Sequence, residues 1–223
     1  LFPRRKGKWN GSLPERDWRN DSEMNVLSRS DDESAAVIDR TIQSLQKATS
    51  TADAVKRIGS ALSQYTVFDL QYIGGFIRRE VNKLPNPYRR AYQPYSLDLL
   101  NQYHVFMQMY RTQKLPDEPI KDPTLWSEYW EIARVQCFVR SGPSDDPFPQ
   151  MEHPLSKFFY RLVYGYVMLI ANGYGHPIGM PFPGGATVHR EGEQVLCPIR
   201  DKERDLPAAL CNFCPAEQDP RYK

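Results

Sequence analysis

The sequence lacks an apolar run that could cross a membrane. Its most apolar stretch, residues 158–171, contains Arg161 and is shorter than the roughly 18 residues that a membrane-spanning helix needs. No apolar run follows the basic residues at the beginning of the chain, which argues against a signal peptide. We therefore expect a cytoplasmic protein in which residues 158–171 form a buried helix.

The net charge is also small, and cysteines and histidines are few. Lysine and arginine number 29 against 27 acidic residues, and the resulting charge of +2 predicts no nucleic-acid partner by itself. Four cysteines without a signal peptide indicate a reducing compartment, and four histidines leave few candidates for a catalytic base. Phosphate-loop, serine-nucleophile and zinc-protease motifs are absent from the sequence. The sequence thus favours a protein without enzymatic activity.

Apolar residues at helical spacing are frequent in the sequence. Between residues 31 and 173, apolar residues recur every three or four positions in six segments. Ser30 followed by Glu33 fits a capping box at the first segment, and prolines separate the segments from one another. We predict a mainly α-helical protein, with a bundle of about six helices over residues 31–173. The segments begin near Asp31, Ser50, Leu70, Ser96, Asp122 and His153.

Residues 1–30 are predicted to form an extended N-terminal arm. They are polar, with scattered apolar residues, and so they bury too little surface to fold alone. Such an arm either packs back on its own domain or binds a partner. The candidate partner-binding anchors are the aromatic residues Phe2, Trp9 and Trp18.

The beginning of the arm also raises an RNA-binding hypothesis. It reads FPRRKGKW, in which clustered cations could follow phosphates while a tryptophan stacks on a base. An RNA- or ribosome-binding protein is therefore an alternative function. The candidate nucleic-acid-binding residues are Arg4, Arg5, Lys6, Lys8 and Trp9.

The amino-acid composition changes in residues 174–223, which contain many glycines, prolines and cysteines and show little helical periodicity. A short β-hairpin is predicted from residues 186–189 and 194–197, with its turn at Glu191-Gly192. We predict that this C-terminal block is a Cys/His metal-binding knuckle. A loop-rich segment has little core of its own, and a metal ion would supply the missing folding energy.

The candidate metal ligands are His176, Cys197, Cys211 and Cys214. The C-x-x-C pair is spaced so that one tight turn directs both thiolates to a single ion, and Cys197 with one histidine completes a tetrahedral Cys3His set. His176 is preferred because an irregular loop approaches the cysteines freely, whereas His189 lies in the hairpin and is the alternative. A redox-active pair and unliganded thiols are the competing interpretations.

Zinc is the expected ion, with an iron–sulfur cluster as the alternative. Four protein ligands leave no open coordination position, which favours a structural ion over a catalytic one. The other ligand-type residues have simpler interpretations. Cys137 lies on an apolar helical stripe and is expected in the core, His153 at a helix start, and His104 within a helix.

The C-terminal block resembles a known family. HPIGMPFPGG from His176, followed by CPIR from Cys197 and ALCNFCP ending at Pro215, is similar to the signature of uncharacterised archaeal proteins, chiefly from methanogens. The resemblance is densest over residues 174–219. It implies a cytoplasmic archaeal protein, implies no known activity, and brings the same four candidate ligands together. The leading expectation is a non-enzymatic accessory subunit that docks on a larger assembly, such as a methanogen energy-metabolism complex.

Overall fold

The computed structural model describes residues 25–112, 117–139 and 153–222. Six of the described helices have twelve residues or more, and a small three-stranded sheet lies near the C-terminal end. The prediction of a mainly α-helical protein is therefore confirmed. The helices are α1 (Asp31–Gln46), α2 (Thr51–Leu62), α3 (Val67–Lys83), α4 (Tyr88–Tyr92), α5 (Asp98–Thr112), α6 (Pro123–Gln136) and α7 (Pro154–Leu169).

The helix starts follow from local capping chemistry. The predicted capping box is present at α1, where the Ser30 side chain accepts the Glu33 N–H and the Glu33 carboxylate accepts the Ser30 N–H at 2.8 Å. The third helix starts earlier than its apolar spacing predicts. Thr66 and Asp69 form a second capping box there and extend α3 by one turn.

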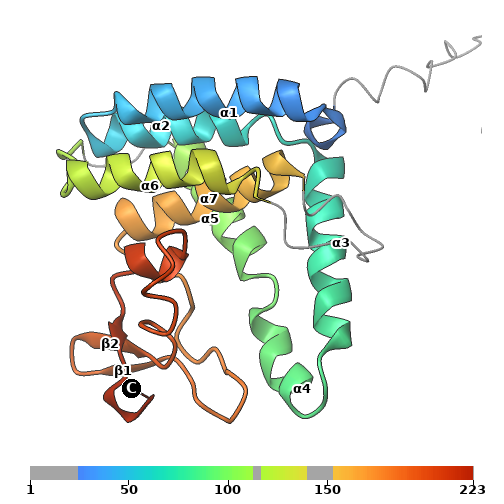
Figure 1. Cartoon of the computed structure of the whole chain (residues 1–223), viewed down its shortest axis with the longest axis vertical. Helices are drawn as coiled ribbons and strands as arrows, with labels where there is room; N and C mark the ends of the chain where they lie inside the picture. The colour runs from blue at the N-terminus through green and yellow to red at the C-terminus, as the bar shows by residue number, and fades with distance from the viewer. Residues whose placement is uncertain (1–24, 113–116, 140–152, 223) are drawn as a thin grey trace, which may run out of the picture.

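Five helices pack around one core, and α7 lies at its centre. Figure 1 shows α1, α2, α5, α6 and α7 side by side, with α3 standing at the edge and joined to α4 at its far end. Three α6 aromatics fill the middle of the core, and the Trp126 indole donates to the Leu45 carbonyl at 2.9 Å. The expected buried helix over residues 158–171 is α7, which is apolar on nearly all sides. None of the helices that the structure describes is long and apolar enough to span a membrane.

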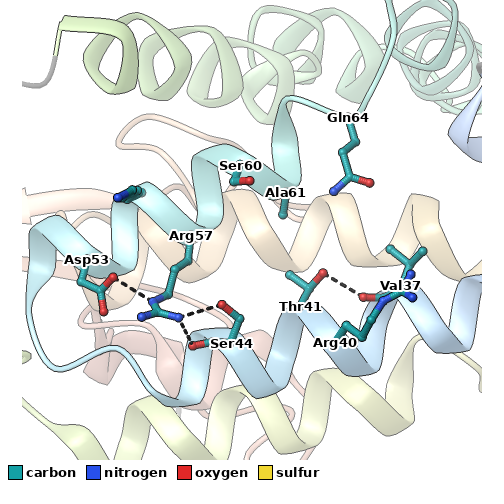
Figure 2. A pocket seen from close by; sticks show the side chains of 10 residues that line it. Val37, Arg40, Thr41, Ser44, Asp53, Arg57, Ser60, Ala61 and Gln64 are labelled. Atoms are coloured by element: carbon teal, nitrogen blue, oxygen red, sulfur yellow. Dashed lines mark hydrogen bonds and ion pairs between the residues drawn. The ribbon is translucent and has the colours of Figure 1, made fainter.

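The first two helices are tied together by an arginine. The Arg57 guanidinium on α2 donates to the Asp53 carboxylate at 2.8 Å and to the Ser44 carbonyl and hydroxyl on α1 at 3.1 and 2.8 Å (Figure 2). A polar contact of this kind fixes the guanidinium in one orientation. The surface between α1 and α2 is therefore polar, while the opposite sides of both helices enter the core.

The last residues of the predicted arm pack on the helical bundle. A short 3-10 helix, Val26–Ser28, precedes α1, and its first side chain is buried. The backbone N–H groups of Val26 and Leu27 donate to the fully buried Asp69 carboxylate at 3.4 and 3.1 Å. The arm residues Phe2, Arg4, Arg5, Lys6, Lys8, Trp9 and Trp18 lie outside the described residues.

Replacing Asp69 with alanine is expected to lower the free energy of unfolding by about 3 kcal/mol. The substitution removes the Asp69 half of the capping box, which accepts the Thr66 N–H, and leaves the buried N–H of Val26 without its acceptor. Urea unfolding followed by circular dichroism measures this loss. The matched control is Asp122→Ala, which removes only an exposed cap of α6 and is expected to cost about 1 kcal/mol. Equal losses in the two variants would contradict a bridging role for Asp69.

The sheet is built from strands β1 (His189–Glu191), β2 (Gln194–Cys197) and β3 (Glu217–Gln218). β1 and β2 pair antiparallel around a turn at residues 192–193, one residue later than predicted, and β3 pairs parallel to β2. The hairpin begins later than predicted because Thr187 bridges Pro181 in the preceding loop instead of entering the ladder. The sheet places the end of β2, and with it Cys197, beside the chain that follows Cys214.

Candidate metal centre

The four predicted ligands come from separate segments of the C-terminal block. His176 lies in the loop after α7, Cys197 ends β2, and Cys211 and Cys214 belong to the 3-10 turn Leu210–Phe213 and its end. The Cys197 Sγ and the His176 Nδ1 atoms are 3.9 Å apart. Sulfur and nitrogen ligands of a tetrahedral zinc ion are separated by about 3.6 Å, so this pair lies near metal-binding distance.

The three late thiols act on one another electrostatically. Burial raises the pKa of Cys197, and the Cys214 thiol raises it further. Burial raises the pKa of Cys211 to about 11, with contributions from Cys197, Glu203 and Cys214. None of the chain's cysteines forms a disulfide. In the metal-free chain the Cys197 and Cys211 thiols are therefore protonated, and a cation that binds them must displace their protons.

Backbone N–H groups point at two of the sulfur atoms. Those of Ile199 and Arg200, in the turn after β2, bond the Cys197 sulfur and favour its thiolate form. The Gly175 N–H donates to the Cys214 Sγ at 3.3 Å. Hydrogen bonds of this kind orient metal ligands and stabilise their charge. The turn CPIR thus directs two backbone N–H groups at the Cys197 sulfur, an arrangement that is typical of metal-binding knuckles.

His176 is held in the form that binds a metal. Burial lowers its pKa, so the imidazole is neutral at pH 7. The Phe182 ring packs edge-on against it, with ring centroids 5.3 Å apart, and restricts its orientation. Among the described residues, however, no three or more His, Cys, Asp or Glu side chains lie close enough together to hold a metal ion. The four residues suit a metal ion by their chemistry, Cys197 and His176 lie close together, and the site itself stays a prediction.

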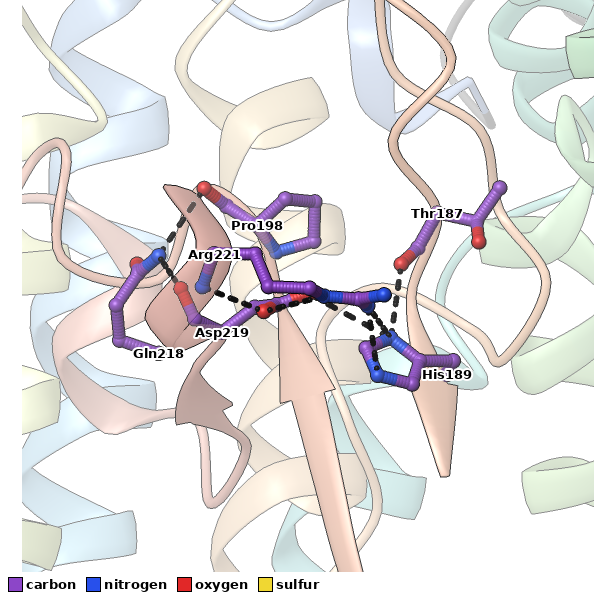
Figure 3. Close-up of polar contacts among 6 residues, drawn as sticks. All are labelled: Thr187, His189, Pro198, Gln218, Asp219 and Arg221. Carbon is purple, nitrogen blue, oxygen red and sulfur yellow. Dashed lines mark hydrogen bonds and ion pairs between the residues drawn. The ribbon is translucent and has the colours of Figure 1, made fainter. Parts of the chain in front are cut away.

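The alternative histidine has other partners. His189 lies on β1, where its ring contacts the Arg221 guanidinium at 2.9 Å and the carboxylate of the fully buried Asp219 at 3.7 Å (Figure 3). Its Nδ1 atom also lies 3.3 Å from the Thr187 carbonyl. His189 therefore belongs to a polar cluster with the C-terminal turn, and His176 is the histidine beside Cys197.

Replacing His189 with alanine is expected to leave the metal content of the protein unchanged, because its ring lies among Arg221 and Asp219. Replacing His176 with alanine is expected to reduce that content, because it removes the imidazole beside Cys197. Elemental analysis of both purified variants makes the comparison. A loss of metal in the His189 variant alone would assign the fourth ligand to His189.

The C-x-x-C turn is anchored in the helical core, which the sequence did not reveal. The Phe213 side chain, between the two cysteines, is 5% exposed and meets the Tyr129 ring of α6 at a centroid distance of 5.0 Å. Arg161 on α7 donates to the Ala208 carbonyl at 2.9 Å and holds the chain that leads into the turn. Cys214 packs against both the helical core and the small apolar cluster beneath the sheet.

The loop that carries His176 is held in place by contacts with residues 88–95. The Tyr88 hydroxyl on α4 lies 3.4 Å from the Pro181 carbonyl. Gly179 has a φ of +89°, and a Cβ atom there would lie 2.5 Å from the Tyr95 hydroxyl oxygen. Glycine therefore allows both the turn and the close approach. Residues 88–95, which lie outside the six predicted helical segments, fix the position of this loop.

Two of the remaining ligand-type residues have structural roles, and the third is exposed. Cys137 is buried in the helical core, and burial raises the pKa of its thiol to about 12, which makes it unreactive. The His153 ring caps α7 by accepting the Leu155 N–H at 3.2 Å. His104 is exposed on α5 beside the Tyr103 ring.

These features define a mainly helical protein with a C-terminal Cys/His block. Residues 50–219 match a family described as an uncharacterized protein conserved in archaea (DUF2115), and the chain belongs to this family. The family resemblance predicted from the C-terminal block is thereby confirmed.

Three relatives come from methanogens. A UPF0305 protein of Methanothermobacter thermautotrophicus is 44% identical over 59 residues, which cover 26% of this chain and 36% of the relative. One of Methanopyrus kandleri is 31% identical over 48% of this chain and 68% of its own length. One of Methanocaldococcus jannaschii is 21% identical over 71% of this chain and 90% of its own length. No solved structure matches the protein.

Proposed function

We propose that the protein is a non-enzymatic interaction protein whose C-terminal block is held by a structural zinc ion. The ligands are His176, Cys197, Cys211 and Cys214. The observation that carries the proposal is the approach of the Cys197 sulfur to the His176 nitrogen at 3.9 Å. Nearby thiols also contribute to the raised pKa values of Cys197 and Cys211. Three thiolates and one imidazole fill a tetrahedral coordination shell, so no position remains for a substrate.

The packing of the block supports a structural role for the ion. The fully buried residues of its own apolar cluster are Val188, Val195, Cys197 and Ala216. So small a core stabilises a fold weakly, and small domains of this kind depend on metals or disulfides. Because the thiols form no disulfide, metal binding is the available means. Free thiols also suit the reducing cytoplasm, where we place the protein.

We extend the proposal to docking on a larger assembly. Val67 and Phe68, on the first turn of α3, are 59% and 62% exposed although they are large and apolar. Adjacent exposed apolar side chains are typical of protein–protein contacts. Because the relatives belong to methanogens, an enzyme complex of methanogen energy metabolism is the proposed assembly.

Anaerobic purification from the native cell, followed by elemental analysis and identification of bound proteins, tests the proposal. We expect a colourless protein with about one zinc ion per chain, together with protein partners. Iron with visible absorption would favour the iron–sulfur alternative, and the absence of any metal would refute the metal site. RNA that remains bound at low salt, and is lost on deletion of residues 1–20, would favour the RNA-binding alternative.

A further inference from the structure

A polar hollow of about 500 Å³ opens between α1 and α2. These two helices lie on the other side of α6 and α7 from the C-terminal block (Figure 1). Its lining residues recur at helical spacing, so one face of each helix forms one wall. Small side chains, Ser44, Ser60 and Ala61, make it hollow where larger residues would fill the groove (Figure 2). Its volume is within the range of small-molecule binding sites.

The hollow adjoins the apolar core, and Val37 and Ala61 supply the apolar part of its lining. Val37, Thr41, Ala61 and Gln64 also line a much smaller cavity of about 10 Å³, which the hollow therefore adjoins. The remaining walls of that cavity come from the core and from the buried end of the arm. They are formed by Val26, Tyr65, Leu155, Phe158 and Leu162. A ligand in the hollow would meet mainly polar groups, together with the apolar side chains of Val37 and Ala61.

The rim carries an excess of positive charge. Arg40, Lys56 and Arg57 line it together with one carboxylate, Asp53. That carboxylate is already engaged by Arg57 at 2.8 Å. Arg40 and Lys56 make no hydrogen bond or ion pair with any other residue in the part of the chain that the structure describes.

Arg57 is pre-oriented for an anion. Its Nε and Nη1 atoms are bound to Asp53 and Ser44, so its plane is fixed across the hollow. The Nη2 atom has no partner among the described residues and stays free to donate. A planar guanidinium held in this way suits phosphate oxygens, because little side-chain entropy is lost on binding.

We propose that this hollow binds a small molecule that carries a phosphate group. Two unpaired cations and one fixed guanidinium match the double negative charge of a phosphate monoester better than the single charge of a carboxylate. The hydroxyl of Ser60 and the amide of Gln64 supply further hydrogen-bond donors at the rim. The side chains of Val37 and Ala61 offer apolar contacts to the organic part of the ligand. This site does not depend on the metal ion.

Titration of the full-length, 15N-labelled protein with inorganic phosphate and pyrophosphate tests the proposal, at an ionic strength held constant with sodium chloride. We expect saturable chemical-shift changes at the α1 and α2 residues that line the hollow. The double variant Arg40→Ala with Lys56→Ala is expected to weaken binding about tenfold or more. Both side chains are exposed, so the fold should be retained.

Two matched double variants serve as controls. Arg90→Ala with Lys121→Ala removes two exposed cations elsewhere, and Arg4→Ala with Arg5→Ala removes two cations of the arm. Both are expected to bind phosphate as the unaltered protein does. The proposal is overturned if shifts at the hollow are absent or equal with chloride alone, or if a control weakens binding as much as the Arg40 and Lys56 variant does.

Discussion

Replacing Cys214 with serine is expected to empty the metal site and to destabilise the C-terminal block by on the order of 5 kcal/mol or more. A structural metal contributes its binding energy to folding, and serine is a poor zinc ligand. Cys214 also receives the Gly175 N–H and packs against both apolar cores, so its loss affects the loop of His176 directly. Elemental analysis and hydrogen exchange of residues 174–222 provide the two readouts.

A matched control separates the loss of a ligand from the loss of a buried thiol. Cys137 is as well packed as any cysteine in the chain, but it lies in the helical core. Cys137→Ala is expected to cost about 1 kcal/mol of stability and to keep the full metal content. If the Cys214 variant keeps its metal, or if both variants lose it equally, the proposed ligand set is wrong.

Replacing Phe213 with alanine is expected to lower the free energy of unfolding by about 3–5 kcal/mol. The ring is 5% exposed and packs edge-on against Tyr129, so its removal leaves a cavity between the C-x-x-C turn and α6. Urea unfolding followed by tryptophan fluorescence measures the loss, because Trp130 contacts the same Tyr129 ring.

The Phe213 variant also tests how the block is attached. Hydrogen exchange is expected to accelerate in residues 206–214 more than in α1 or α2, because the anchor of the turn is lost. Phe68→Ala is the control, since that ring is 62% exposed and its removal should cost less than about 1 kcal/mol. Similar losses in the two variants would mean that Phe213 does not anchor the turn.

Much of the helical fold could be predicted because its signals are local. The capping box of Ser30 and Glu33 and the apolar spacing of α1 depend on residues within a few positions of one another. The same holds for the β-hairpin, whose turn was predicted at Glu191-Gly192 and lies one residue later, at residues 192–193. The strand β3 has two residues and pairs with a distant strand, so no local pattern could identify it.

The candidate site was less accessible to sequence reasoning because its geometry depends on tertiary contacts. The spacing of Cys211 and Cys214 suggests a ligand pair, but it does not reveal that Phe213 points into the helical core. Likewise, the choice between His176 and His189 depends on a loop that Tyr88 and Tyr95 position from a separate part of the chain. The polar hollow needs two helices to face each other, and each helix alone looks like an ordinary solvated surface.

Helix α3 connects the helical bundle to the C-terminal block. The first turn of this helix is fastened to the bundle through Asp69, and its far end continues into α4, which touches the loop of His176. Helix α3 is therefore held at one end by the helical bundle and at the other end, through α4, by the C-terminal block. A partner that binds Val67 and Phe68 would contact a helix whose far end is fixed in position only when the C-terminal block is folded.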